Sequence, residues 1–124
     1  MAADVADRYA VEDIARQAVS RYRAIDTWVN KAGVSVYGRL GEVSEEDHRR
    51  VFDVNFWGVV NGSLVALPHL ERSHGALINV GSELSEAVIP LQGMYASSKH
   101  AVKGFTDALR VEVVRVDEAP VSIS

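Results

Sequence analysis

The spacing of apolar residues changes several times along the chain, and each change predicts a different element. From Val11 to Tyr22 apolar residues recur every three or four positions, and Asp7 stands where a side chain can cap a helix, so we expect a helix there. Residues 25–30, IDTWVN, are β-branched and aromatic and lead into a Gly-containing stretch. That pattern is typical of a buried strand that ends in a loop.

A second helix and a second strand follow in the same order. Ser44 precedes three acidic residues, which is a favourable N-terminus for a helix. The apolar spacing predicts that this helix covers residues 45–68, with Asn55 interrupting its apolar face. Residues 76–82, ALINVGS, are almost continuously apolar, as expected for a strand in a parallel sheet covered on both faces.

The last long apolar pattern predicts a helix over residues 95–116, and PVSIS at 120–124 begins a third strand. Strands that alternate with helices favour an α/β layer fold with a parallel sheet and right-handed crossovers. In such sheets ligands lie beyond the carboxyl ends of the strands. The loops after Asn30 and after Val80 are therefore the places to look for a site.

Composition narrows the class of protein. The 124 residues are 48% hydrophobic and 24% charged, which fits one soluble globular domain over residues 1–124. A formal net charge of -4 argues against nucleic-acid and membrane-surface partners, and we interpret His48, Arg49 and Arg50 as a solvated helix face.

Cysteine and histidine usage excludes other chemistry. The chain has no cysteine, which rules out disulfides and thiolate sites and fits a cytoplasmic location. Its four histidines lack the paired spacing of a metal site, so we expect no bound metal. The N-terminus does not look like a signal peptide, and no apolar run reaches the length of a membrane span.

Candidate chemistry concentrates in GMYASSK at residues 93–99. On a helix Tyr95 and Lys99 would lie on one face, one turn apart, although a pair at this spacing is more often a solvated stripe. Ser82 follows the second strand, thirteen residues before Tyr95, and a loop of that length could fold it back against the phenol. With the buried amide of Asn55, these residues suggest a polar site between two helices and a strand end.

Four segments, WVNKAG, DVNFWG, INVGS and YASSK, resemble in order and spacing the motifs of the short-chain dehydrogenase/reductase family. The resemblance implies an oxidoreductase that transfers hydride between a nicotinamide cofactor, NAD or NADP, and an alcohol or carbonyl substrate. It also implies that Asn55, Ser82, Tyr95 and Lys99 are the catalytic tetrad, with Tyr95 as the acid/base.

The same resemblance extends to the cofactor, the fold and the assembly. It places Asp4 and Val5 near the adenine and Asn30, Ala32 and Gly33 beside the cofactor, together with Tyr95 and Lys99. The implied fold is Rossmann-like, an incomplete doubly wound α/β/α domain of three layers. The implied assembly is a homodimer or homotetramer formed through helices 45–68 and 95–116.

Elementary acid–base chemistry explains why this reaction needs a lysine beside a tyrosine. A free tyrosine hydroxyl titrates near ~10, which is too high for a good base at neutral pH. A cation about 4 Å away, at an effective dielectric constant of about 20, would stabilise a phenolate by ~4 kcal/mol. The resemblance implies that Ser82 holds the substrate oxygen and that Asn55 supports a water linked to Lys99.

The sequence departs from the family pattern at two points. A Gly-rich turn for the cofactor pyrophosphate is expected after a first strand, but the first glycine here is Gly33. Lys31 replaces the second asparagine of the usual NNAG form. An incomplete domain would expose a sheet edge and an apolar face, so the alternative function is a non-catalytic fragment that only self-associates.

Overall fold

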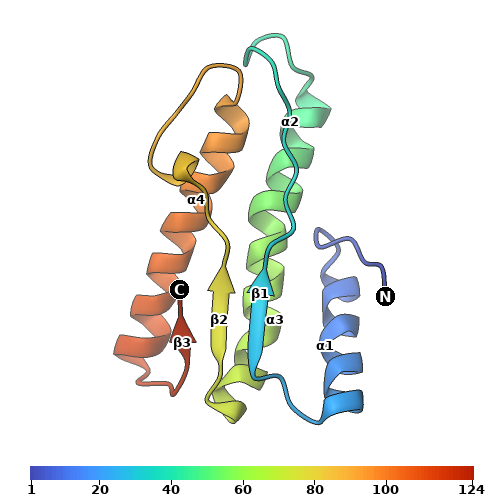
Figure 1. Ribbon diagram of the computed structural model, residues 1–124, viewed down its shortest axis with the longest axis vertical. Helices are drawn as coiled ribbons and strands as arrows, with labels where there is room; N and C mark the ends of the chain where they lie inside the picture. The colour runs from blue at the N-terminus through green and yellow to red at the C-terminus, as the bar shows by residue number, and fades with distance from the viewer.

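The computed structural model describes residues 1–124 as a three-stranded parallel sheet in the order β1-β2-β3, with helices packed on one side (Figure 1). The strands are β1 (Thr27–Asn30), β2 (Ala76–Asn79) and β3 (Ser122–Ile123). The α-helices are α1 (Arg8–Tyr22), α2 (Glu45–Phe52), α3 (Gly58–Ser73) and α4 (Gly93–Arg110). Two π-helical segments, η1 (Asp53–Trp57) and η3 (Val111–Val116), and one 3-10 turn, η2 (Glu83–Ser85), complete the chain.

The helix starts form as the sequence predicts. The carboxylate of Asp7 accepts the backbone N–H of Tyr9 at 2.9 Å, at the N-terminus of α1. The hydroxyl of Ser44 accepts the N–H of Asp47 at 3.1 Å, at the N-terminus of α2. Each cap satisfies a backbone donor that the first helical turn leaves without an internal partner.

The helix predicted over residues 45–68 is longer and less regular than expected. It runs through α2, η1 and α3 to Ser73, and Pro68 lies inside α3 rather than at its end. Proline costs the helix one backbone hydrogen bond. The helix nevertheless continues because Leu70, two residues further on, is completely buried in the core. His74 then ends it in a left-handed conformation, with φ of 54°.

The prediction that β2 is buried on both faces was wrong for this chain. Leu77 is completely buried, but its neighbour Ile78 is 37% exposed, and Val29, its partner on β1, is 51% exposed. The described helices lie against the other face of the sheet, as the positions of α3 and α4 in Figure 1 indicate. The α/β class is confirmed, and these residues form two of the three expected layers.

The core lies between the covered face of the sheet and the helices. Its buried hydrophobic cluster draws on α1, α3, β2, β3, the C-terminal part of α4, η3, and the residues just before β1 and β3. The members are Val11, Ala15, Ile25, Val65, Ala66, Leu70, Leu77, Leu109, Val113, Val121 and Ile123. This core holds the strands and helices in place, so the loops beyond the strand ends are presented on a packed scaffold.

At Gly62, α3 approaches β1 more closely than any side chain would allow. A Cβ atom at this position would collide with the side-chain oxygen of Asn30 and would lie 3.0 Å from Nε1 of Trp28. Trp28 Nε1 donates a hydrogen bond to that same oxygen of Asn30 at 2.9 Å. The missing side chain of Gly62 therefore makes room for a half-buried hydrogen bond within β1, on the face that packs against α3.

We expect Gly62→Ala to lower the free energy of unfolding by ~1–3 kcal/mol, because the added methyl group overpacks this contact. Gly104→Ala is the matched control, since Gly104 lies on α4 and a Cβ there meets nothing within 4 Å. The control should stabilise the chain by about 0.5–1 kcal/mol through helix propensity. Urea denaturation of both variants measures the difference, and equal effects would contradict the close packing at Gly62.

Candidate active site

The carboxyl ends of β1 and β2 lie next to each other and open into the two loops that the sequence singles out. Asn30 and Asn79 are partners in the parallel register, and the N–H of Val80 donates to the carbonyl of Asn30 at 3.0 Å. The loop after Asn30 leads to α2, and the loop after Val80 leads through η2 to α4. Both loops therefore start from one fixed point in the sheet.

Tyr95 and Lys99 lie on one face of α4, as their spacing predicts. The ammonium group of Lys99 donates to the carbonyl oxygen of Val80 at 3.2 Å and lies 5.7 Å from the centroid of the Tyr95 ring. Tyr95 is half-buried, and its hydroxyl makes no hydrogen bond within the chain. The phenol is therefore available to a molecule that binds beside it.

The burial of Lys99 shows that Tyr95 and Lys99 are not simply a solvent-exposed stripe on a helix. The residue is only 5% exposed, and its ammonium makes no salt bridge with a carboxylate. A buried lysine is rare without a paired charge, because removing the ammonium from water is costly. Here the neighbours of the ammonium are the carbonyl oxygen of Val80 and the ring of Tyr95. The packing of α4 therefore keeps the cation beside the phenol.

Asn55 is fully buried and ties three segments together. Its side-chain oxygen accepts the N–H of Val34 at 2.8 Å, and its amide donates to the carbonyl of Val34 at 2.8 Å and to the hydroxyl of Ser98 at 3.1 Å. Ser98 in turn donates to the carbonyl of Tyr95 at 2.7 Å. The amide thus joins the loop after β1, the π-helical turn η1 and the first turns of α4.

Ser82 lies in the loop after β2, as predicted, but its hydroxyl has a structural contact there. It accepts the N–H of Leu84 at 3.1 Å, while the N–H of Ser82 donates to the hydroxyl of Ser85 at 3.0 Å. Ser82 and Tyr95 are not hydrogen-bonded to each other. A serine hydroxyl carries one proton and two lone pairs, so this cap leaves the proton of Ser82 free to bind another group.

Four of the residues predicted to contact a cofactor surround one groove. Asp4, Val5, Ala32 and Gly33 line a hollow of about 630 Å³, with Val54 on its wall. Small apolar side chains beside the paired charges of Asp4 and Arg50 suit a flat heteroaromatic base that carries an amino group. The residues present therefore fit the adenine end of a dinucleotide, whereas no Gly-rich turn for its pyrophosphate occurs among them.

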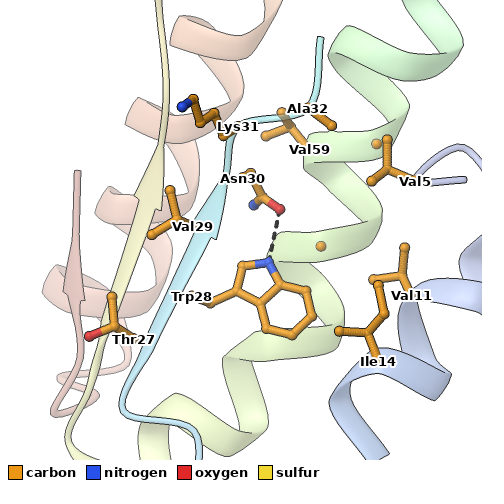
Figure 2. Close-up of a pocket in the computed structure, with 12 residues that line it drawn as sticks. Val5, Val11, Ile14, Thr27, Trp28, Val29, Asn30, Lys31, Ala32 and Val59 are labelled. Carbon is orange, nitrogen blue, oxygen red and sulfur yellow. Dashed lines mark hydrogen bonds between the residues drawn. The ribbon is translucent and has the colours of Figure 1, made fainter. Parts of the chain in front are cut away.

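Asn30 behaves differently from the other predicted cofactor residues. Figure 2 shows its side chain in a second hollow, of about 340 Å³, where its oxygen accepts the indole N–H of Trp28. Its amide nitrogen donates to Asn79 at 2.8 Å and to Ser63 at 3.2 Å. The side chain of Asn30 is therefore used inside the fold, where it holds the start of the loop after β1.

Arg50 is a residue of the groove that the sequence interpretation missed. It was assigned to a solvated helix face, but its guanidinium donates to the Asp4 carboxylate at 3.0 Å, and it lines the same groove. The backbone N–H of Ala6 and the Arg50 guanidinium both hold the pKa of Asp4 below its ordinary value. The two residues are 46 positions apart, so no local pattern could have linked them.

The parallel sheet and the helices packed on it define an α/β protein of the Rossmann-like class. A model of the short chain dehydrogenase family matches residues 1–121. The chain therefore belongs to the short chain dehydrogenase family.

Relatives and solved structures agree with this assignment. The chain is 43% identical to an uncharacterized oxidoreductase of Bacillus subtilis, YxnA, over 98% of its own length and 35% of the relative's. It is 38% identical to SadH, a putative oxidoreductase of Mycobacterium tuberculosis, over 98% of its own length and 44% of the relative's. It thus spans less than half the length of either protein.

Among solved structures, it is similar to a short chain dehydrogenase/reductase from Burkholderia phymatum in complex with NAD. That likeness has a TM-score of 0.91 and 30% identity, over 96% of this chain and 43% of the other. It is also similar to a gluconate 5-dehydrogenase from Burkholderia cenocepacia in complex with NADP and tartrate, with a TM-score of 0.85 and 32% identity, over 91% and 45%. No helix of the chain is both long and apolar enough to cross a bilayer.

Replacing Asn55 tests the link between the loop and α4. We expect Asn55→Ala to lower the free energy of unfolding by ~2–4 kcal/mol, because it removes three hydrogen bonds made by a completely buried side chain. Asn61→Ala is the control, since Asn61 is half-buried and only donates to the carbonyls of Val5 and Ala6. Hydrogen exchange of the Val34 amide should accelerate only in Asn55→Ala, and unchanged protection would contradict the link.

The Arg50–Asp4 pair gives a second prediction. Arg50→Gln should raise the pKa of Asp4 toward its ordinary value, because one of the groups that stabilise the carboxylate is lost. The shift should be partial, since the N–H of Ala6 remains. Arg49→Gln is the control because Arg49 pairs with Glu45. Carboxyl carbon shifts of Asp4 followed against pH measure the effect, and equal titration in both variants would contradict the assigned contact.

Proposed function

We propose that this chain carries the catalytic residues of a nicotinamide-dependent oxidoreductase that interconverts an alcohol and a carbonyl compound. In this proposal Tyr95 is the acid/base, Lys99 stabilises its phenolate, Ser82 holds the substrate oxygen, and Asn55 completes the tetrad. The observation that carries the proposal is the buried ammonium of Lys99, directed at the Tyr95 ring with no carboxylate to neutralise it.

The division of work follows from the contacts. When bound, NAD or NADP would accept or supply the hydride. The Tyr95 hydroxyl would take the proton from an alcohol oxygen during oxidation, or give it to the carbonyl oxygen during reduction. Lys99 favours the phenolate by charge, because opposite charges in a partly buried site attract strongly. Ser82 has a hydroxyl proton to donate to that same substrate oxygen.

Asn55 supports the proposal through position. Its three hydrogen bonds hold the loop after β1 and the first turns of α4 in one arrangement. All of its polar atoms are used in these contacts, so its side chain would act by fixing the backbone around Tyr95. A water that relays protons to Lys99 would then bind a backbone carbonyl of this region rather than the amide itself.

The cofactor would be either NAD or NADP. Asp4, Val5, Ala32 and Gly33 would hold the adenine end, and Tyr95 and Lys99 would lie beside the nicotinamide end. The relatives bound to NAD and to NADP are both similar to this chain, which supports a nicotinamide cofactor without choosing between the two. In this proposal the substrate is a small alcohol or carbonyl compound. The protein is cytoplasmic and has no nucleic-acid or membrane partners.

Self-association is the second candidate function, and it could accompany the first. Trp57 on η1 is 52% exposed, and Val111 on η3 is 46% exposed, so the long helical stretches 45–73 and 93–116 present apolar side chains to solvent. These stretches are the proposed contact in a homodimer or homotetramer. The exposed side chains of Val29 and Ile78 favour association of a non-catalytic fragment through the bare sheet face.

Tyr95→Phe tests the acid/base assignment. We expect turnover of carbonyl compounds with NADH or NADPH to fall by about 10²–10⁴-fold, because phenylalanine has no proton to transfer. Affinity for the reduced cofactor, measured by calorimetric titration, should stay within about twofold, since a single hydroxyl is removed. Tyr37→Phe is the matched control because Tyr37 is 73% exposed and lies outside the site.

Two results would overturn parts of the proposal. Full turnover by Tyr95→Phe would remove Tyr95 from the mechanism. A folded chain that binds neither NADH nor NADPH saturably would favour the self-associating fragment. Sedimentation of the same sample measures association directly, so the two candidate functions are tested on one preparation.

A further inference from the structure

A line of buried and half-buried polar side chains runs under the covered face of the sheet and is not used by the proposed chemistry. Asn30 donates to the side-chain oxygen of Asn79 at 2.8 Å, and the amide of Asn79 donates to the hydroxyl of Thr106 at 2.9 Å. Thr106 donates to the carbonyl of Val102 at 2.8 Å. Ser63 on α3 is also part of this line and donates to Asn79 at 3.4 Å.

This line reaches α4 on the face that carries Lys99. Thr106 follows Lys99 by seven residues, which is two helical turns, so the two side chains share a face. On the strand side, their partners are consecutive residues: Asn79 binds Thr106, and the carbonyl of Val80 binds Lys99. The end of β2 is therefore fastened to α4 at two points.

Two such contacts constrain the helix more than either does alone. A single contact would let α4 shift along the strand end or turn about it, whereas a second contact two turns away prevents both movements. Little of this part of the helix is open to water, because Thr106 is 7% exposed and Ser98 and Val102 are buried on the same helix. The half-buried amide of Asn79 would lose a hydrogen bond to the buried hydroxyl of Thr106, so we expect the contact to persist.

We infer that Thr106 and Asn79 are positioning residues for Lys99: their hydrogen bond fixes α4 against the end of β2 so that the Lys99 ammonium stays on the carbonyl of Val80, beside Tyr95. This inference rests on the proposed function of Lys99 for its catalytic meaning. Neither residue would touch substrate or cofactor, and each acts through the position of Lys99.

The chain offers a direct measurement of this effect that needs no turnover. It contains only three lysines, and Lys31 and Lys103 are exposed while Lys99 is buried. Acetylation of the folded protein by a small activated ester, read by peptide mass spectrometry, reports how often the Lys99 amine leaves its site. The other two lysines serve as internal references.

Thr106→Val removes the hydroxyl while keeping the shape of the side chain. We expect the acetylation rate of Lys99, relative to Lys31 and Lys103, to rise about five- to tenfold, as the loss of one buried hydrogen bond would allow. Thr106→Ser restores a hydroxyl and should return the rate to within about twofold of the unmodified chain. Thr106→Ala is the second variant if the Thr106→Val protein does not fold.

Ser63→Ala is the matched control. It removes a buried hydroxyl that donates to the same Asn79 but belongs to α3, so Lys99 should keep its original rate. An unchanged Lys99 rate in folded Thr106→Val, or in folded Thr106→Ala, would overturn the inference. An equal rise in Ser63→Ala would overturn it too, because the polar line would then support the fold in general. Loss of the Tyr95 mechanism would leave these rates unaffected, so the two proposals fail separately.

Discussion

A buried cation without a counter-ion is the constraint on which the site depends. The ammonium of Lys99 has given up water, and its partners are the carbonyl of Val80 and the ring of Tyr95. That arrangement is stable only if α4 is held firmly against the end of β2. Much of the polar chemistry inside this chain can be understood as meeting that requirement, because the contacts of Asn55, Asn79 and Thr106 all connect α4 to the loops or strands beside it.

The covered face of the sheet shows how polar and apolar packing divide this task. Towards the amino ends of the strands the core is hydrophobic, with Leu77 and Ile123 buried side by side in register. At the carboxyl ends the same face changes to the paired amides of Asn30 and Asn79. Hydrophobic burial supplies stability without direction. Hydrogen bonds between amides fix distances, and they occur where the loops of the site begin.

Sequence patterns predicted those features that depend on neighbours along the chain. The caps at Asp7 and Ser44, the parallel α/β order and the shared face of Tyr95 and Lys99 follow from local spacing, and all are present. The prediction that the helix ends at Pro68 was wrong. The helix continues to Ser73, because burial of Leu70 outweighs the local cost of proline.

Contacts between distant residues lay beyond the reach of such patterns. The pairing of Arg50 with Asp4 and the line from Asn30 to Thr106 are set by tertiary packing. A polar residue at the end of an apolar strand was the one available signal for Asn79. Its partner on α4 could be identified only from the structure.

The exposed face of the sheet bears on both candidate functions through the same residues. Val29 and Ile78 are partners in register and lie exposed on the face opposite the helices, while the outer edge of β1 has no strand beside it. The site itself is built on the covered face and at the strand ends. A partner chain bound to the bare face would therefore leave the Lys99–Val80 contact in place. The backbone groups of Val80 are already used, because its N–H donates to Asn30 and its carbonyl accepts from Lys99. Association through the bare face and the proposed catalysis at the strand ends are physically compatible, and the proposed catalytic residues do not need to rearrange for the chain to acquire a partner there.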